Sequence, residues 1–183
     1  GVDGVEVDYA KAFSYYEQAA AQGDNVAINN LGSLYYSGIG TQRDLVKAAD
    51  SFNRAVEAGN TEAAVNLAFL YLTGSGVIKD NRKAIDLFMR AAKVNNPTAA
   101  FMLGYAYEKG FVVPQDYAKA FELIKIAADA GYDEAQYQLA ELYLNGQGVP
   151  QNYGNAIKSL NKAIAQGHVK AMTSLGEILV EGK

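Results

Sequence analysis

The chain has no cysteine and no tryptophan, and its 183 residues include only one histidine and three prolines. Without cysteine it can form no disulfide and offers no thiolate for catalysis or metal binding. Its formal net charge is −4, with the basic residues interspersed among the acidic ones, so it lacks the basic footprint of nucleic-acid binding. No apolar run approaches the roughly 18 residues that a transmembrane helix needs, so we expect no membrane insertion.

The sequence repeats itself every 36 residues. A small set of alanines, leucines, tyrosines and glycines returns at fixed places in this period: Ala27, Ala63, Ala99, Ala135 and Ala171; Leu31, Leu67, Leu103, Leu139 and Leu175; Tyr35, Tyr71, Tyr107 and Tyr143; Gly38, Gly74, Gly110, Gly146 and Gly182. Such a period is typical of stacked helix pairs that bury their apolar faces against their neighbours. We predict an all-α fold, a right-handed α–α superhelix (solenoid) of about five 36-residue helix–turn–helix repeats.

The same register predicts the domain organisation. Residues 1–183 form one array, with a partial repeat at 5–24, full repeats at 25–60, 61–96, 97–132 and 133–168, and a partial repeat at 169–183. Both termini fall in turns between helices, and neither shows the polar capping unit of a finished array. We therefore expect an array cut from a longer one, with possible end-to-end self-association of the fragment.

One repeat shows how the helices are delimited. Ala27, Leu31 and Tyr35 lie at helical spacing and predict a first helix with one apolar stripe, which Gly38 ends. Asp44 then stands where an N-cap would begin the second helix, as do Asp80, Asp116 and Asn152 in the later repeats. Asn60 and Asn96 stand where caps would begin the first helices of the next repeats.

Small residues return at one position inside the first helices: Gly32, Ala68, Gly104, Ala140 and Gly176. Glycine inside a helix costs about 1 kcal/mol relative to alanine, so its recurrence needs a reason. We interpret it as close contact with a neighbouring helix. We interpret the repeating tyrosines likewise as packing residues.

These residues resemble the Sel1-like repeat family, relatives of the tetratricopeptide repeat. Its pattern is matched most fully in residues 63–92, at Ala63, Leu67, Tyr71, Gly74, Gly76, Val77, Asp80, Lys83, Ala84, Ala91 and Ala92. The family's tryptophan is replaced throughout, and the third turn lacks the second glycine.

The resemblance implies a non-enzymatic scaffold or adaptor that binds a partner protein or peptide on the concave face formed by the first helices. It also implies a role in bacterial host interaction or virulence, as in entry-enhancing Sel1-repeat proteins, and a periplasmic or secreted location rather than a cytoplasmic one. The alternative is a regulatory module that docks on and inhibits an enzyme such as a cell-wall hydrolase.

Positions that fail to repeat on the first helices are the candidate binding residues, because a packing role would impose uniformity and a binding role would not. Several are large aromatics where polar residues would suffice for solubility. Some of them could instead pack against the next first helix. At 100° per residue these positions point away from the repeating stripe of alanine, leucine and tyrosine, so we expect their side chains to face outward. We predict partner binding at Asn29, Tyr36, Val65, Phe69, Phe101, Tyr105, Glu108, Tyr137 and Glu141.

No motif in the sequence predicts catalysis. His168, the single histidine, falls in a turn between repeats, and we expect it to be exposed and without a role. No cluster of histidine and cysteine predicts a metal site, and the Gly-x-Gly turns lack the lysine and serine or threonine of a phosphate loop. We therefore expect no enzyme activity, no cofactor and no metal.

Overall fold

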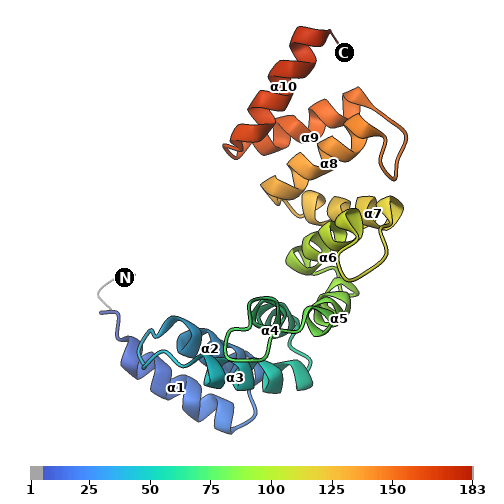
Figure 1. The fold of residues 1–183 in the computed structure, drawn as a ribbon. Helices are drawn as coiled ribbons and strands as arrows, with labels where there is room; N and C mark the ends of the chain where they lie inside the picture. Colours follow the sequence, from blue (N-terminus) through green and yellow to red (C-terminus); the bar gives the residue numbers. More distant parts are fainter. Residues whose placement is uncertain (1–5, 183) are drawn as a thin grey trace. The chain divides into compact units, whose positions relative to one another are not determined.

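The structure is a computed structural model that describes residues 6–182. All regular structure in these residues is helical, in ten helices (Figure 1). The chain divides into two compact units, Gly1–Arg90 and Ala91–Lys183. The all-α prediction of stacked helix–turn–helix repeats is confirmed.

In the first unit, α2 and α4 are the first helices of their repeats, and α1 and α3 are second helices. Consecutive helices pack against one another from α1 to α4. The helices are α1 (Tyr9–Ala21), α2 (Asn25–Ser37), α3 (Leu45–Glu57), α4 (Thr61–Thr73) and α5 (Asn81–Ala92).

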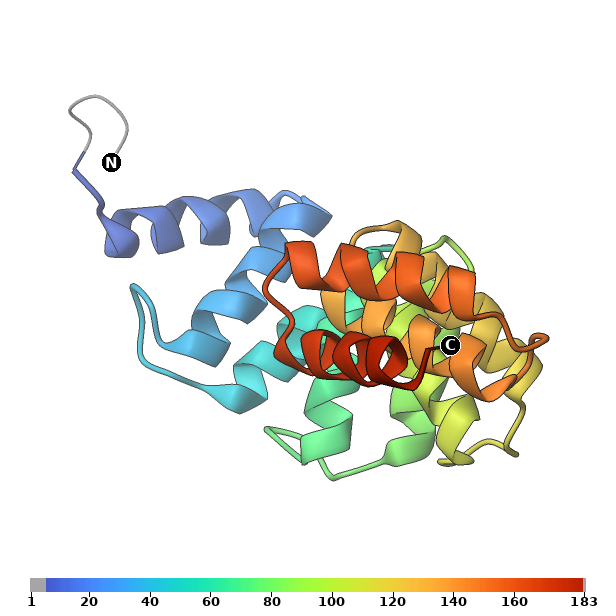
Figure 2. The ribbon, with the colours of Figure 1, turned by 90° about the horizontal axis from the view of Figure 1, so that it is seen from above.

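The second unit follows the same order, with α6, α8 and α10 as first helices. Each helix again packs on the next, and Figures 1 and 2 both show α9 and α10 side by side. The helices are α6 (Pro97–Lys109), α7 (Tyr117–Asp129), α8 (Asp133–Asn145), α9 (Tyr153–Ala165) and α10 (Val169–Glu181).

The helices begin at the caps that the register predicts. A side-chain oxygen of each predicted capping residue accepts a hydrogen bond from a backbone N–H in the first turn, which satisfies a donor that the helix itself cannot pair. These residues are Asp44, Asp80, Asp116 and Asn152 at the second helices, and Asn60 and Asn96 at α4 and α6.

The tight turns at Gly40, Gly76 and Gly148 bring the backbone close to the preceding second helix. Gly148 has a φ of 72°, and a Cβ there would lie 2.0 Å from the carbonyl oxygen of Tyr117. The turn that lacks the second glycine places Val112 at the same register position with a φ of 65°. A β-branched residue is strained in this left-handed region, because its Cβ crowds the following carbonyl.

The small-residue position confirms the predicted close contact at two glycines. A Cβ on Gly32 would lie 2.6 Å from the ring of Phe52, and a Cβ on Gly104 would lie 2.7 Å from Cγ1 of Ile124. Gly176 differs, since no side chain or neighbouring helix among residues 6–182 comes within 4 Å of the equivalent point.

The repeating tyrosines pack as predicted. Phe13 meets Tyr35 edge to face at 5.3 Å between ring centroids, and Phe121 meets Tyr143 in the same way. The ammonium groups of Lys47, Lys83 and Lys119, which stand one repeat period apart, lie over the rings of repeating tyrosines, at 5.2 Å from the ring centroid for Lys119 over Tyr107. The ring contacts join a second helix to the first helix of the next repeat, and the lysine contact joins the two helices of one repeat.

Candidate functional site

A surface pocket lies between the first helices α2 and α4 of the first unit. We call it the α2/α4 pocket; its lining residues are Ser33, Tyr36, Phe52, Asn66, Phe69, Leu70 and Thr73. Phe52 and Leu70 are each 3% exposed and form its floor, while Tyr36 and Phe69 stay exposed on its walls. The ring of Phe69 is held edge to face against Phe88 at 5.4 Å. The pocket is therefore apolar, with two aromatic side chains accessible from outside.

The polar groups around this pocket are partly paired within the protein. Thr73 donates its hydroxyl to the carbonyl oxygen of Phe69 at 2.8 Å, and the amide of Asn66 donates to Oδ1 of Asn29 at 3.2 Å. Arg43 donates from Nε to the carbonyl oxygen of Tyr36 at 3.0 Å, and its guanidinium lies over the Tyr36 ring at 5.8 Å. These contacts orient the pocket rim.

A second pocket occupies the equivalent place three repeat periods later, between α8 and α10 of the second unit. Its lining residues are Glu141, Leu144, Asn145, Gln151, Tyr153, Ser174, Glu177, Ile178 and Glu181. Glu141 stands at the register position of Ser33, and Glu177 at that of Phe69. This α8/α10 pocket is thus acidic where the α2/α4 pocket is aromatic.

The carboxyl group of Glu141 is the perturbed group of the α8/α10 pocket. Burial raises its pKa above the ordinary glutamate value, and the negative charges of Glu177 and Glu108 raise it further. Ser174 donates its hydroxyl to Oε1 of Glu141 at 3.4 Å, which opposes the rise. The raised pKa means that ionised Glu141 is less favourable in the folded chain than in water.

A polar network fills the corresponding stretch between α6 and α8. Glu108 is 5% exposed and accepts hydrogen bonds from Lys109 and Gln138, both at 2.5 Å. The hydrogen bond that Lys109 donates to Glu108 is the main cause that raises the pKa of Lys109. The ammonium of Lys109 also lies 5.5 Å from the ring centroid of Tyr105. Both carboxylate oxygens of Glu108 therefore accept hydrogen bonds from within the chain.

His168 contradicts the expectation of an exposed turn residue: it is 9% exposed and is the N-cap of α10. Its Nδ1 accepts the backbone N–H of Ala171 at 3.2 Å, so the ring proton sits on Nε2, 3.0 Å from Oε2 of Glu134. The imidazole also stacks on Tyr137, with centroids 4.8 Å apart. The repeat register could have predicted the capping role of His168, because Asp24, the aligned residue in the first unit, also caps its helix.

The structure divides the predicted binding residues of the first unit into two pairs. Tyr36 and Phe69 meet in the α2/α4 pocket. The expectation of an outward-facing side chain is wrong for Asn29, 5% exposed, and for Val65, 7% exposed. Asn29 pairs with the amide of Asn66, and Val65 is part of the core because its side of α4 packs inward.

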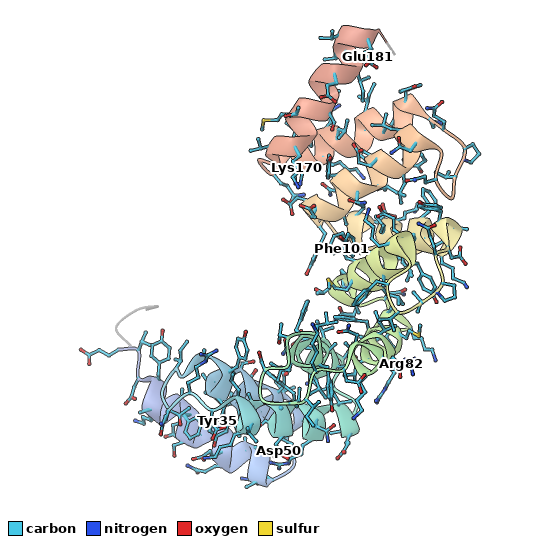
Figure 3. All side chains as sticks on the ribbon, in the orientation of Figure 1. Tyr35, Asp50, Arg82, Phe101, Lys170 and Glu181 are labelled. Atoms are coloured by element: carbon cyan, nitrogen blue, oxygen red, sulfur yellow. The ribbon has the colours of Figure 1, made fainter. Side chains whose placement is uncertain are left out.

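In the second unit, Tyr105 is exposed, Phe101, Tyr137 and Glu141 are half-buried, and Glu108 is buried (Figure 3 labels Phe101 on α6). The outward-facing expectation is therefore wrong for Glu108, whose carboxylate is held by Lys109 and Gln138. Phe101 packs towards Tyr132 at 6.5 Å. Tyr105 presents the most accessible ring of this set.

Several residues in or beside the two pockets were not among the predicted binding residues. Phe52 is a core residue, but its ring also floors the α2/α4 pocket, where it faces Gly32, which has no side chain. Arg43 lies in a turn, and no sequence pattern places its guanidinium over Tyr36. Glu177 could have been found, because it aligns with Phe69 in the repeat register.

The described residues hold no group of three or more histidine, cysteine, aspartate or glutamate side chains that could bind a metal ion. Among those same residues, no helix is both long and apolar enough to cross a membrane.

The stacked helix pairs place the chain in the class of helical-repeat scaffolds. The Sel1 repeat model matches residues 1–24, 25–60, 61–96, 97–132 and 133–168, so the chain belongs to the Sel1 repeat family. None of the curated proteins compared with the chain matches it.

Solved structures of this family resemble the chain closely. A protective antigen of uropathogenic Escherichia coli strains is 34% identical, with a TM-score of 0.89 over 93% of this chain and 36% of its own. A Sel1 repeat protein from Oxalobacter formigenes is 32% identical, with a TM-score of 0.89 over 93% of this chain and 49% of its own. The chain thus spans about a third to a half of the length of these relatives.

An immunity protein from Pseudomonas aeruginosa is a more distant match. It is 25% identical, with a TM-score of 0.58 over 92% of this chain and 62% of its own.

Proposed function

We propose that the chain is a non-enzymatic scaffold that binds a partner protein or peptide through the surface of its first helices. The observation that carries this proposal is the α2/α4 pocket, where Tyr36 is 47% exposed beside the exposed ring of Phe69. Exposed aromatic side chains around a pocket are typical anchors of protein interfaces.

The contrast between repeating and non-repeating positions supports the proposal. The positions that build the array are occupied by the same residue types in successive repeats, whereas the pocket positions change from Tyr36 and Phe69 to Leu144 and Glu177. A role confined to packing would not produce an aromatic pocket in one place and an acidic pocket in the other. Tyr105 adds an exposed ring on α6.

Site-specific photo-crosslinking tests the proposal. A benzophenone side chain replaces Tyr36 or Phe69 in the full protein, which is then illuminated in its native compartment. Ile78 is the matched control, because it is 91% exposed in the same unit but lies outside the pocket. We expect a discrete crosslinked protein from the pocket positions and none from Ile78. Equal labelling from all three positions, or no product, would contradict the proposal.

A second candidate function is a regulatory module that docks on an enzyme and inhibits it. The similarity to a structure described as an immunity protein is the observation that favours it. The partner identified by crosslinking is then purified without the chain, and activity assays before and after the chain is added separate the two candidates. An enzyme whose rate falls when the chain is added supports the inhibitor, and a partner with unchanged activity supports the scaffold.

A further inference from the structure

We propose that the α2/α4 pocket accepts an extended acidic segment of the partner, with one apolar side chain in the pocket and a neighbouring carboxylate on Arg43. This inference rests on the proposed function and specifies the partner chemistry at the same site. Its failure would leave the scaffold proposal in place.

The chemistry of the pocket floor favours an apolar side chain. Phe52 and Leu70 present carbon atoms at the bottom, and the Phe69 ring is fixed by its contact with Phe88. The hydroxyls of Ser33 and Thr73 donate to carbonyl oxygens of their own helices, at 3.4 and 2.8 Å. With these donors occupied, an aromatic or leucine-like side chain gains most from entering.

The charge around the pocket selects an acidic neighbour. None of the seven lining residues is charged, α2 contains no charged residue, and α4 contains only Glu62, in its first turn. The turns after the two helices place Arg43 and Lys79 beside the helix ends, against Gly38 and Gly74. The pocket therefore opens beside the turn that carries Arg43, whose guanidinium lies over Tyr36, and away from the single carboxylate of α2 and α4.

The cation on this rim has unused hydrogen-bonding capacity. Arg43 uses Nε for the carbonyl oxygen of Tyr36, and in the part of the chain that the structure describes its terminal nitrogens have no hydrogen bond or ion pair. The adjacent Asp44 is engaged elsewhere, because its Oδ1 accepts two backbone N–H groups of α3 and its Oδ2 lies 3.9 Å from Lys47. A partner carboxylate can thus form a two-point contact with the guanidinium.

The amide of Asn66 favours an extended backbone. Its nitrogen donates to Asn29, whereas its oxygen accepts no hydrogen bond within residues 6–182. Because this amide lines the pocket, its oxygen can accept a main-chain N–H of the bound segment. A polar group of this kind orients a ligand in a mainly apolar pocket.

The α8/α10 pocket excludes the same segment. Glu141 and Glu177 occupy the positions of Ser33 and Phe69, so a carboxylate there would meet like charges. Juxtaposed like charges disfavour the wrong site, and the acidic segment is therefore directed to the first unit.

A displayed library of random 12-residue peptides, panned against the full chain, tests the inference. We expect enrichment of an apolar residue flanked by aspartate or glutamate. Panning against Phe69→Glu should lose this motif, and panning against Glu177→Gln, the matched substitution in the other pocket, should retain it. Circular dichroism melting of each variant confirms that it is folded.

Reversing the charges of Arg43 and of the peptide tests whether the acidic residue contacts Arg43. One enriched peptide is synthesised as selected and with lysine in place of its acidic residue. We expect Arg43→Glu to weaken the first peptide by about tenfold or more and to favour the lysine version. Enrichment without acidic residues, no enrichment at all, or an unchanged affinity in Arg43→Glu would overturn the inference. The crosslinking experiment would still decide the proposed function.

Discussion

The α2/α4 and α8/α10 pockets occupy one register position but have opposite chemistry. The first is walled by Tyr36 and Phe69 beside a cation, and the second by Glu141 and Glu177. Their underlying cores are built alike, with alanine and leucine at the same places. The comparison teaches that the helix pair fixes where a pocket forms, whereas a few outward positions decide what it can bind.

The largest expected effect concerns the small-residue position of the two units. Gly32→Ala should lower the free energy of unfolding by about 1–3 kcal/mol, because its Cβ would overlap the Phe52 ring under the α2/α4 pocket. Gly176→Ala should raise it by up to about 1 kcal/mol, since the added methyl group meets no atom and alanine favours the helix. Urea unfolding of both variants measures the difference; losses of equal size would show that the units pack alike at this position.

The next effect concerns the helix caps. His168→Ala should destabilise the second unit by about 1 kcal/mol, because α10 loses its N-cap. His168→Asn should recover part of this loss, since asparagine caps α4 at Asn60. Hydrogen exchange at the Ala171 amide reports the cap directly. Full recovery in the asparagine variant would mean that the contacts with Glu134 and Tyr137 add nothing to stability.

A smaller effect concerns the turns. Val112 has a left-handed φ at the position that Gly40 and Gly76 occupy in the first unit. Val112→Gly should relieve about 1–2 kcal/mol of backbone strain and lose up to about 1 kcal/mol through the greater freedom of the unfolded chain, for a net gain. Thermal unfolding followed by circular dichroism measures it. A lower melting temperature would indicate that the valine side chain contributes packing that outweighs the strain.

The smallest effect is the pH dependence of Glu141. Its pKa is raised in the folded chain by burial first and by Glu177 and Glu108 next, so between the ordinary and the raised pKa the folded state holds more protons than the unfolded state. Stability contributed by this group is therefore present at low pH and lost as pH rises through the folded pKa. Glu141→Gln should stabilise the chain slightly at neutral pH and lose this advantage in acid. Melting curves across that range test it; an advantage that grows in acid would contradict the raised pKa.

Much of the fold could be predicted from the sequence, because helix caps and packing alanines act locally and recur. Asp44 and Asn96, for example, cap the helices that their positions predict. The candidate site was harder to predict, since the orientation of a helix side chain depends on how far the next helix rotates towards it. A fixed 100° per residue placed Val65 and Glu108 outside, whereas packing and an internal hydrogen-bond network enclose them.

The close approach of turn glycines to the preceding second helix has a consequence for how such a chain can diversify. At Gly76 the contact is with the backbone carbonyl of Leu45, and at Gly148 it is with that of Tyr117. At these two turns the spacing between the turn and the preceding repeat is therefore set by main-chain atoms. Substitution of side chains elsewhere leaves these atoms unchanged. Outward residues of the first helices can mutate towards new specificities without altering this spacing, so recognition and architecture evolve separately.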